Sequence, residues 1–166
     1  MNQTKPNRMA RALAKANKAP AFLRPWLVDR ALGNAVKLVG TCGLHFDKID
    51  KHEFIVTVKN KTKVQNHIGQ IHAATMILLA ETATGLLVGY NMPDDKIPLI
   101  KSLNTRFLRR TEGSMKAVAQ LSDDQIAMIH REDKGETLVP VVVTDATGEE
   151  VISCEALWAW IPKKRM

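Results

Sequence analysis

The stretch from His72 to Gly89 reads His-Ala-Ala-Thr-Met-Ile-Leu-Leu-Ala-Glu-Thr-Ala-Thr-Gly-Leu-Leu-Val-Gly, and Glu81 is its one charge. A helix that is apolar on every side is buried within a protein or a membrane. About 18 apolar residues suffice to cross a bilayer, but a carboxylate at mid-length costs about 2.5 kcal/mol or more in lipid. We therefore predict a buried central helix in a water-soluble domain, with no membrane span.

The carboxylate of Glu81 is expected to lie in an apolar wall. Burial raises the pKa of a carboxyl group, and groups with shifted pKa values gather where chemistry happens. A structural alternative is an ion pair with an Arg of a neighbouring strand. His72 lies nine residues before Glu81, so on one helix the two point in opposite directions, roughly 13 Å apart along the axis. If both serve one reaction, the site needs groups from two chains.

The chain of 166 residues is long enough for one domain with a sizeable core. Its two cysteines, Cys42 and Cys154, lie in apolar runs that resemble strands. This placement indicates buried thiols of a reduced compartment rather than a disulfide framework. The N-terminus lacks the apolar segment of a signal peptide. Together these features predict a cytoplasmic protein.

The net charge of +7 is concentrated in residues 1–28, which hold six basic residues and no acidic one. The rest of the chain is nearly neutral, so we expect no nucleic-acid partner for the domain. Composition and apolar spacing predict two short helices near 7–18 and 22–32. We divide the chain into a helical arm (1–34), a domain (35–162) and a basic tail (163–166). A solvated arm with one packed face competes with two alternatives, a basic lid over an anionic ligand and a transit peptide.

Alternating apolar residues predict strands on both sides of the central helix. Two strands precede the helix, at 36–46 and 54–58, and a polar loop over 60–70 leads into it. Four strands follow, near 97–107, 115–121, 139–143 and 151–161, with a short helix that a capping box opens at Ser122. The fold class is therefore α+β, with about six mostly antiparallel strands wrapped round one helix. Edge strands and an incompletely covered helix predict a homodimer, with a dimer of dimers left open.

This order of elements, with Asn66, Gly69 and His72 before the helix and Glu81 inside it, resembles the hotdog-fold acyl-CoA thioesterases. It is most similar to their phenylacetyl-CoA thioesterase-like branch and to relatives of unassigned function. The resemblance covers roughly residues 35–162. The chain departs from the pattern at Ala73, where the family has Gly, and at Glu81, where it has Asp.

The resemblance implies thioester hydrolysis at a site that two subunits share. The Ala73 N–H would hold the acyl oxygen at the helix N-terminus, with the N–H of Gly69 or Gln70 as a candidate second donor. Asn66 would position water or the thioester, and Glu81 of the partner chain would act as base or nucleophile. We expect His72 to shape the turn rather than to titrate, because its neighbours offer no carboxylate to orient it.

Basic residues should flank the phosphates of a CoA ester. The candidates lie on one predicted strand and just beyond it: Lys101, Arg106, Arg109 and Arg110. For each of these the alternative is a solvated strand face, and Lys101 has the further alternative of pairing with Glu81. No metal is expected, because His67 and His72 are badly spaced as ligands, and CoA enters as part of the substrate rather than as a cofactor. The competing function is a non-catalytic acyl-binding or structural hotdog protein, in which Lys101 or Arg106 neutralises Glu81.

Overall fold

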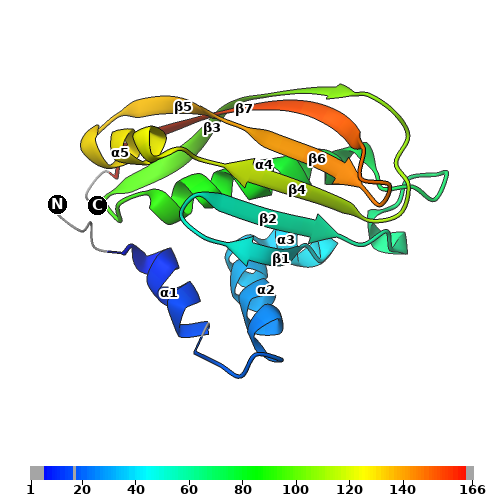
Figure 1. Cartoon of the computed structure of the whole chain (residues 1–166), viewed down its shortest axis with the longest axis horizontal. Helices are drawn as coiled ribbons and strands as arrows, with labels where there is room; N and C mark the ends of the chain where they lie inside the picture. The colour runs from blue at the N-terminus through cyan, green and yellow to red at the C-terminus, as the bar shows by residue number, and fades with distance from the viewer. Residues whose placement is uncertain (1–5, 17, 164–166) are drawn as a thin grey trace.

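Seven strands form one antiparallel sheet in the computed structural model, which describes residues 6–16 and 18–163 (Figure 1). The strands pair in the order β1–β2–β4–β6–β7–β3, and β5 also pairs with β7. Their bounds are β1 His45–Ile49, β2 Glu53–Val58, β3 Lys96–Phe107, β4 Met115–Gln120, β5 Gly135–Val139, β6 Val141–Asp145 and β7 Glu150–Pro162. Two consecutive strands, β5 and β6, replace the single strand predicted at 139–143. The strand is interrupted at Pro140, which has no N–H to donate to a neighbouring strand.

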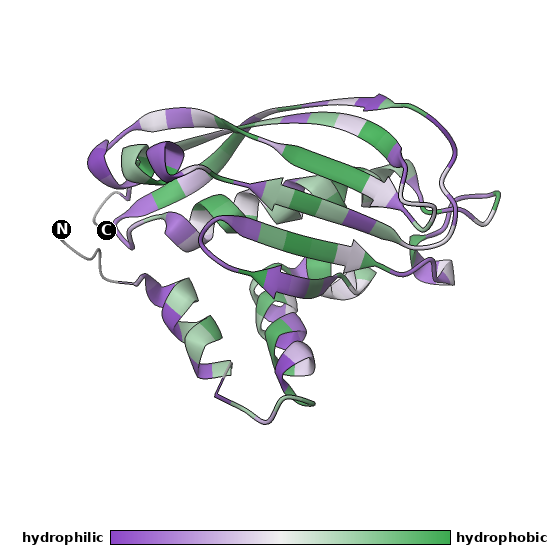
Figure 2. Ribbon diagram, viewed as in Figure 1, coloured by the Kyte–Doolittle hydropathy of each residue, from purple (hydrophilic) through white to green (hydrophobic). Residues whose placement is uncertain are grey.

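The predicted central helix is confirmed as α4 (Ala73–Asn91), which contacts β2, β3, β4, β6 and β7. Figure 2 shows apolar residues along the strands that enclose it. Trp158 of β7 donates its indole N–H to the Thr84 hydroxyl of α4 at 2.9 Å, so a polar group in the core has a partner. Within the described part of the chain, α4 is the one helix long and apolar enough to cross a membrane. Its packing inside the sheet accounts for that composition.

The N-terminal helices are α1 (Arg8–Ala16), α2 (Arg24–Ala35) and α3 (Lys37–Cys42). The first two confirm the predicted pair, whereas the strand predicted from Val36 is wrong over the residues of α3. The reason is a close approach of backbones: a Cβ on Gly40 would lie 2.9 Å from the Gly33 carbonyl oxygen. This contact between α2 and α3 overrides the alternating pattern of the sequence, and the first strand begins only at His45.

Asn7 fastens α1 to the end of α4. Its side-chain oxygen accepts the Ala10 N–H at 2.8 Å, which satisfies a donor of the first turn of α1. Its side-chain nitrogen donates to the carbonyl oxygens of Gly89 (2.7 Å), Tyr90 (3.1 Å) and Met92 (2.6 Å). One amide therefore serves the start of one helix and the end of another.

The remaining helices are η1 (Thr62–Val64), before α4, and α5 (Asp123–Arg131). The predicted capping box of α5 is present, formed by Ser122 and Gln125. At the other end of α5, the buried Lys96 ammonium donates to the carbonyl oxygens of Ile129, His130 and Glu132. Strand β3, which begins with this lysine, lies at the edge of the sheet.

Candidate functional site

The loop before α4 is held by backbone hydrogen bonds across its base. The Asn66 N–H donates to the Gln70 carbonyl at 2.8 Å, and the His72 N–H donates to the Val64 carbonyl at 2.8 Å. Gly69 has a φ of 74°, a conformation that a residue with a side chain adopts only with strain. The predicted positions 66, 69 and 72 therefore specify the shape of this loop.

The side chain of Asn66 forms hydrogen bonds within the same loop. Its Oδ1 atom accepts the N–H groups of Ile68 at 3.0 Å and Gln70 at 3.1 Å, while the Gly69 N–H donates to the Asn66 backbone carbonyl at 3.1 Å. The N–H groups of Gly69 and Gln70, the two further candidate oxyanion donors, are thus already engaged in hydrogen bonds to Asn66.

His72 caps the N-terminus of α4. Its Nδ1 atom accepts the Ala74 N–H at 3.0 Å, so the imidazole presents a lone pair there and carries its proton on Nε2. The His72 carbonyl accepts the N–H groups of Thr75 and Met76. The N–H of Ala73 has no hydrogen-bond partner among the described residues. A free N–H at the positive end of a long helix can bind a developing oxyanion.

Glu81 lies on the face of α4 that the sheet leaves partly uncovered, together with Ile77, Leu78 and Gly85. Its carboxylate accepts one long hydrogen bond, from the Thr82 hydroxyl at 3.5 Å. No ion pair among residues 6–16 and 18–163 includes it. Burial raises the pKa of Glu81, and the hydrogen bond from Thr82 lowers it by a smaller amount. The group is therefore a partly desolvated carboxyl with no countercharge among the described residues.

One chain does not bring Ala73 and Glu81 together. They lie eight residues apart on α4, which separates them by about 12 Å along the axis. The structure keeps Asn66, Gly69, His72 and Ala73 in one turn and places Glu81 two turns further along.

The four candidate phosphate-binding residues differ in their partners. Lys101 forms an ion pair with Glu136 of β5 instead of Glu81. Leu99, two residues earlier, pairs with Ala159, which pairs with Glu136, so alternation along β3 places Lys101 on the face of Glu136. Arg106 and Arg110 are exposed, and no ion pair of the described chain includes them. Arg109 is held by the carboxylates of Asp145 at 2.8 Å and Glu149 at 3.3 Å.

Asp145, like Lys96, is a buried charged residue that the sequence did not predict. Burial alone would raise its pKa, but the hydroxyl and N–H of Thr147, the Glu112 N–H and the Arg109 guanidinium lower the pKa to about 2. The turn sequence Asp145-Ala-Thr-Gly148 was the available signal, since Asp in a turn accepts nearby N–H groups. Its partner Arg109 depends on strand pairing, which no local pattern supplies.

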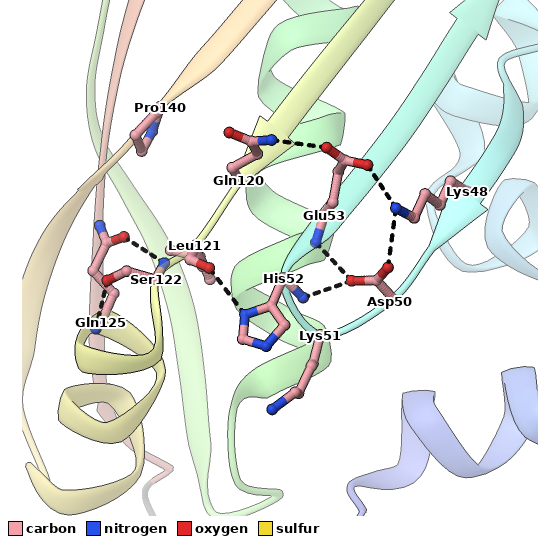
Figure 3. Close-up of a pocket in the computed structure, with 10 residues that line it drawn as sticks. All are labelled: Lys48, Asp50, Lys51, His52, Glu53, Gln120, Leu121, Ser122, Gln125 and Pro140. Atoms are coloured by element: carbon pink, nitrogen blue, oxygen red, sulfur yellow. Dashed lines mark hydrogen bonds and ion pairs between the residues drawn. The ribbon is translucent and has the colours of Figure 1, made fainter.

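A hollow lies away from this site, between the β1–β2 turn and α5 (Figure 3). Its charged groups satisfy one another: the Lys48 ammonium lies 2.8 Å from Glu53 and 3.3 Å from Asp50, and Gln120 donates to Glu53 at 2.8 Å. The side chains that line it offer no unpaired buried group, so we place the candidate site on α4, which carries the free Ala73 N–H and the Glu81 carboxylate.

The protein has the hotdog fold, a class that solved structures of several thioesterases share with it. A Pseudomonas aeruginosa protein of unknown function, described as a probable thioesterase, is 22% identical with a TM-score of 0.74, over 83% of this chain and 95% of its own. A Haemophilus influenzae thioesterase is 14% identical with a TM-score of 0.63, over 81% of this chain and 90% of its own. A thioesterase family protein from Silicibacter pomeroyi is 13% identical with a TM-score of 0.64, over 81% and 96%.

The chain belongs to the family described as Domain of unknown function (DUF4442), whose model matches residues 24–161. The match begins at the first residue of α2, so it includes two of the helices that precede the sheet. No curated protein matches the chain significantly in sequence.

Proposed function

We propose that the protein hydrolyses acyl-CoA thioesters at a site formed by two subunits. The observation that carries the proposal is Glu81, a partly desolvated carboxyl with a raised pKa and no countercharge among the described residues. The free N–H of Ala73 supplies the second group that acyl transfer needs. The hotdog structures of proteins described as thioesterases support the same chemistry.

In this proposal the thioester carbonyl oxygen binds at the Ala73 N–H of one subunit. Glu81 of the other subunit removes a proton from water, and the water oxygen attacks the carbonyl carbon. The tetrahedral intermediate carries its negative charge against the helix N-terminus, where the α4 dipole stabilises it. The carbon–sulfur bond then breaks, and the leaving CoA sulfur takes up the proton that Glu81 removed from water, which regenerates the carboxylate. Direct attack by the Glu81 carboxylate, with hydrolysis of an anhydride, is the alternative course.

The proposed dimer rests on two uncovered features of the single chain. Strand β3 is an edge strand on which Leu99 and Ile100 are 43% and 41% exposed. The adjacent face of α4 carries the half-buried Ile77 and Leu78 beside Glu81. A twofold contact would cover this apolar surface and bring Glu81 of one copy towards the loop of the other.

Two arginines are the best placed groups for the CoA phosphates. Arg106 and Arg110 are exposed and free of ion pairs within the described chain. Lys101 and Arg109 would have to exchange their present carboxylate partners for a phosphate. We propose Arg106 and Arg110 as direct phosphate contacts, with Lys101 and Arg109 at the margin of the same surface.

The test is release of free thiol from short, medium, long and aryl acyl-CoA esters. Glu81→Gln should lower kcat by at least about 10²-fold on any ester that the wild type hydrolyses, the scale of a lost acid–base group. Glu150→Gln is the matched control, since it removes an exposed carboxylate of β7 that forms no ion pair among the described residues. A folded wild type that releases no thiol from any ester of the panel contradicts hydrolysis and favours a non-catalytic acyl-binding protein.

A further inference from the structure

The helices α1 and α2 extend away from the sheet, and their far ends are joined by the segment that precedes α2 (Figure 1). Residues 20–26 of this segment are exposed without interruption. Phe22 is 81% exposed, Trp26 58% and Leu23 39%, and Figure 2 shows the apolar character of this end of the arm. Large apolar side chains gathered at a projecting tip mark an interaction surface.

The same tip is positively charged. Lys15, Lys18, Arg24 and Arg30 are exposed, and no ion pair of the described residues includes them. The nearest acid on the arm, Asp29, is turned towards the body of the protein, where it contacts His45 and accepts the Phe46 N–H. The surface therefore combines an apolar end with a surround of free bases.

The aromatic and basic groups are also in contact with each other. The Arg30 guanidinium lies 5.6 Å from the centre of the Trp26 ring. This arrangement keeps a cation beside the amphipathic indole, whose flat apolar body and single N–H suit the boundary between lipid headgroups and acyl chains.

We propose that this tip, residues 18–30, docks the protein on the surface of a bilayer that contains anionic lipid. Phe22, Leu23 and Trp26 enter the interfacial region, and the bases lie among the lipid phosphates. The attachment is peripheral and makes no use of α4, which stays in the core. It is independent of the chemistry proposed for Glu81, and a variant of that residue should bind lipid like the wild type.

Two other occupants fit the surface less well. A second copy of the chain would bring its own free bases against these, and the one acid of the arm, Asp29, is turned away towards His45. A nucleic acid would use the bases and stack on Trp26, but it would leave the aliphatic Leu23 and the exposed Pro20 and Ala21 without a role. An anionic bilayer is the partner that takes both the charge and the whole apolar tip.

Tryptophan fluorescence gives a direct readout. The chain has three tryptophans, and Trp158 and Trp160 are buried at 5% and 0% exposure, so a vesicle-induced change in emission reports Trp26. With the full-length protein and vesicles of phosphatidylcholine and phosphatidylglycerol, emission should shift to shorter wavelength and brominated lipid should quench it. Phosphatidylcholine vesicles alone should give a much smaller change, and raised salt should reverse the binding.

Two pairs of substitutions separate the contributions in a vesicle co-sedimentation assay. Phe22→Ser with Trp26→Ser removes the apolar tip, and Arg24→Gln with Arg30→Gln removes two bases; each pair should weaken partitioning roughly tenfold or more. Lys116→Gln with Lys134→Gln is the matched control, because it removes two exposed charges elsewhere and should leave binding unchanged. Circular dichroism verifies that each variant is folded.

The outcomes are decisive in both directions. The proposal is supported if the wild type and the control variant bind anionic vesicles and both tip variants bind them weakly. Absence of vesicle binding, or equal binding by wild type and both tip variants, overturns it. If the protein does not bind vesicles but binds RNA in a salt-sensitive way that needs Trp26, the partner is a nucleic acid. If it does not bind vesicles but forms an oligomer in solution that depends on the tip, the partner is a second copy of the chain.

Discussion

The Nδ1 atom of His72 accepts the N–H of Ala74 at 3.0 Å, and this bond leaves the N–H between them, that of Ala73, without a partner. The imidazole thus accepts one backbone N–H of the first turn of α4 and leaves the adjacent N–H, that of Ala73, free. In the proposed mechanism His72 positions the loop, and the backbone N–H of Ala73 is the group that would meet the substrate.

His72→Asn should retain most of the activity, because Asn is a preferred N-cap and accepts the same N–H. His72→Ala should lose about 1 kcal/mol of stability and some activity through a looser loop. Thermal unfolding and kcat measured on both variants check this. A drop of 10² or more in the kcat of a stable His72→Asn protein would show instead that the imidazole itself takes part in proton transfer.

Glu81 predicts an unusual dependence of stability on pH. Burial raises its pKa in the folded protein, so stability is complete below the unfolded pKa and is lost as pH rises through the folded pKa. Glu81→Gln should therefore unfold at a higher temperature than the wild type at neutral pH, and the difference should vanish near pH 4. If it instead unfolds at a lower temperature at neutral pH, the ionised carboxylate has a favourable partner.

The same titration should control catalysis. A general base works when ionised, so kcat should rise with pH through a midpoint above the ordinary pKa of a glutamate. The Glu81→Asp variant keeps the charge with a shorter reach and should retain more activity than Glu81→Gln. A flat pH profile in a wild type limited by chemistry argues against Glu81 as the base.

Asp145 and Arg109 predict the opposite dependence. The Asp145 pKa is lowered to about 2, so its contribution is present above the unfolded pKa and is lost as pH falls from about 4 towards 2. Asp145→Asn should cost about 2 kcal/mol at neutral pH, the scale of hydrogen bonds to a charged group. Urea unfolding at several pH values measures this, with the exposed and paired Glu149 replaced by Gln as the control. Equal stability of Asp145→Asn and wild type at pH 7 would contradict it.

The hydrogen bonds of Asn7 should determine how stably α1 packs against the end of α4. Asn7→Ala removes three hydrogen bonds to the end of α4 and the cap of α1, so α1 should undock at a cost of about 1–2 kcal/mol. Hydrogen exchange should become faster in α1 and unchanged in the strands. Lys15→Ala, on the exposed side of the same helix, should leave exchange as it is.

The sequence predicted what short-range patterns encode. The apolar run with Glu81 predicted α4, the Ser122–Gln125 spacing predicted the capping box, and alternation predicted most of the strands. These features depend on residues a few positions apart. The loop residues Asn66, Gly69 and His72 were also located correctly as neighbours of the helix start, although the hydrogen bonds show each of them shaping the loop.

Features that depend on distant partners were not predicted. Helix α3 replaces an expected strand because Gly33 and Gly40 let two backbones approach. Lys96 is buried because it meets carbonyls more than thirty residues away at the end of α5. Lys101 was predicted to pair with Glu81, but strand pairing places it on the face of the sheet that carries Glu136. None of these relationships has a signature in the local sequence.

The central claim is that one site takes its N–H from one chain and its carboxylate from another. Ala73→Pro removes that N–H with little disturbance, since Pro is favoured at the first helical position and His72 already has the extended conformation, φ −66° and ψ 143°, that a following Pro requires. Glu81→Gln removes the other group. Ala73→Gly retains the N–H and is the matched control for the first variant.

The decisive measurement is the activity of Ala73→Pro and Glu81→Gln chains after they are unfolded together and refolded as a mixture. Each variant alone should be nearly inactive. In a mixed dimer one site receives both defects and the other receives neither, so the mixture should regain roughly a quarter of wild-type activity. A mixture that contains mixed dimers and is no more active than the two variants measured separately would contradict the shared site.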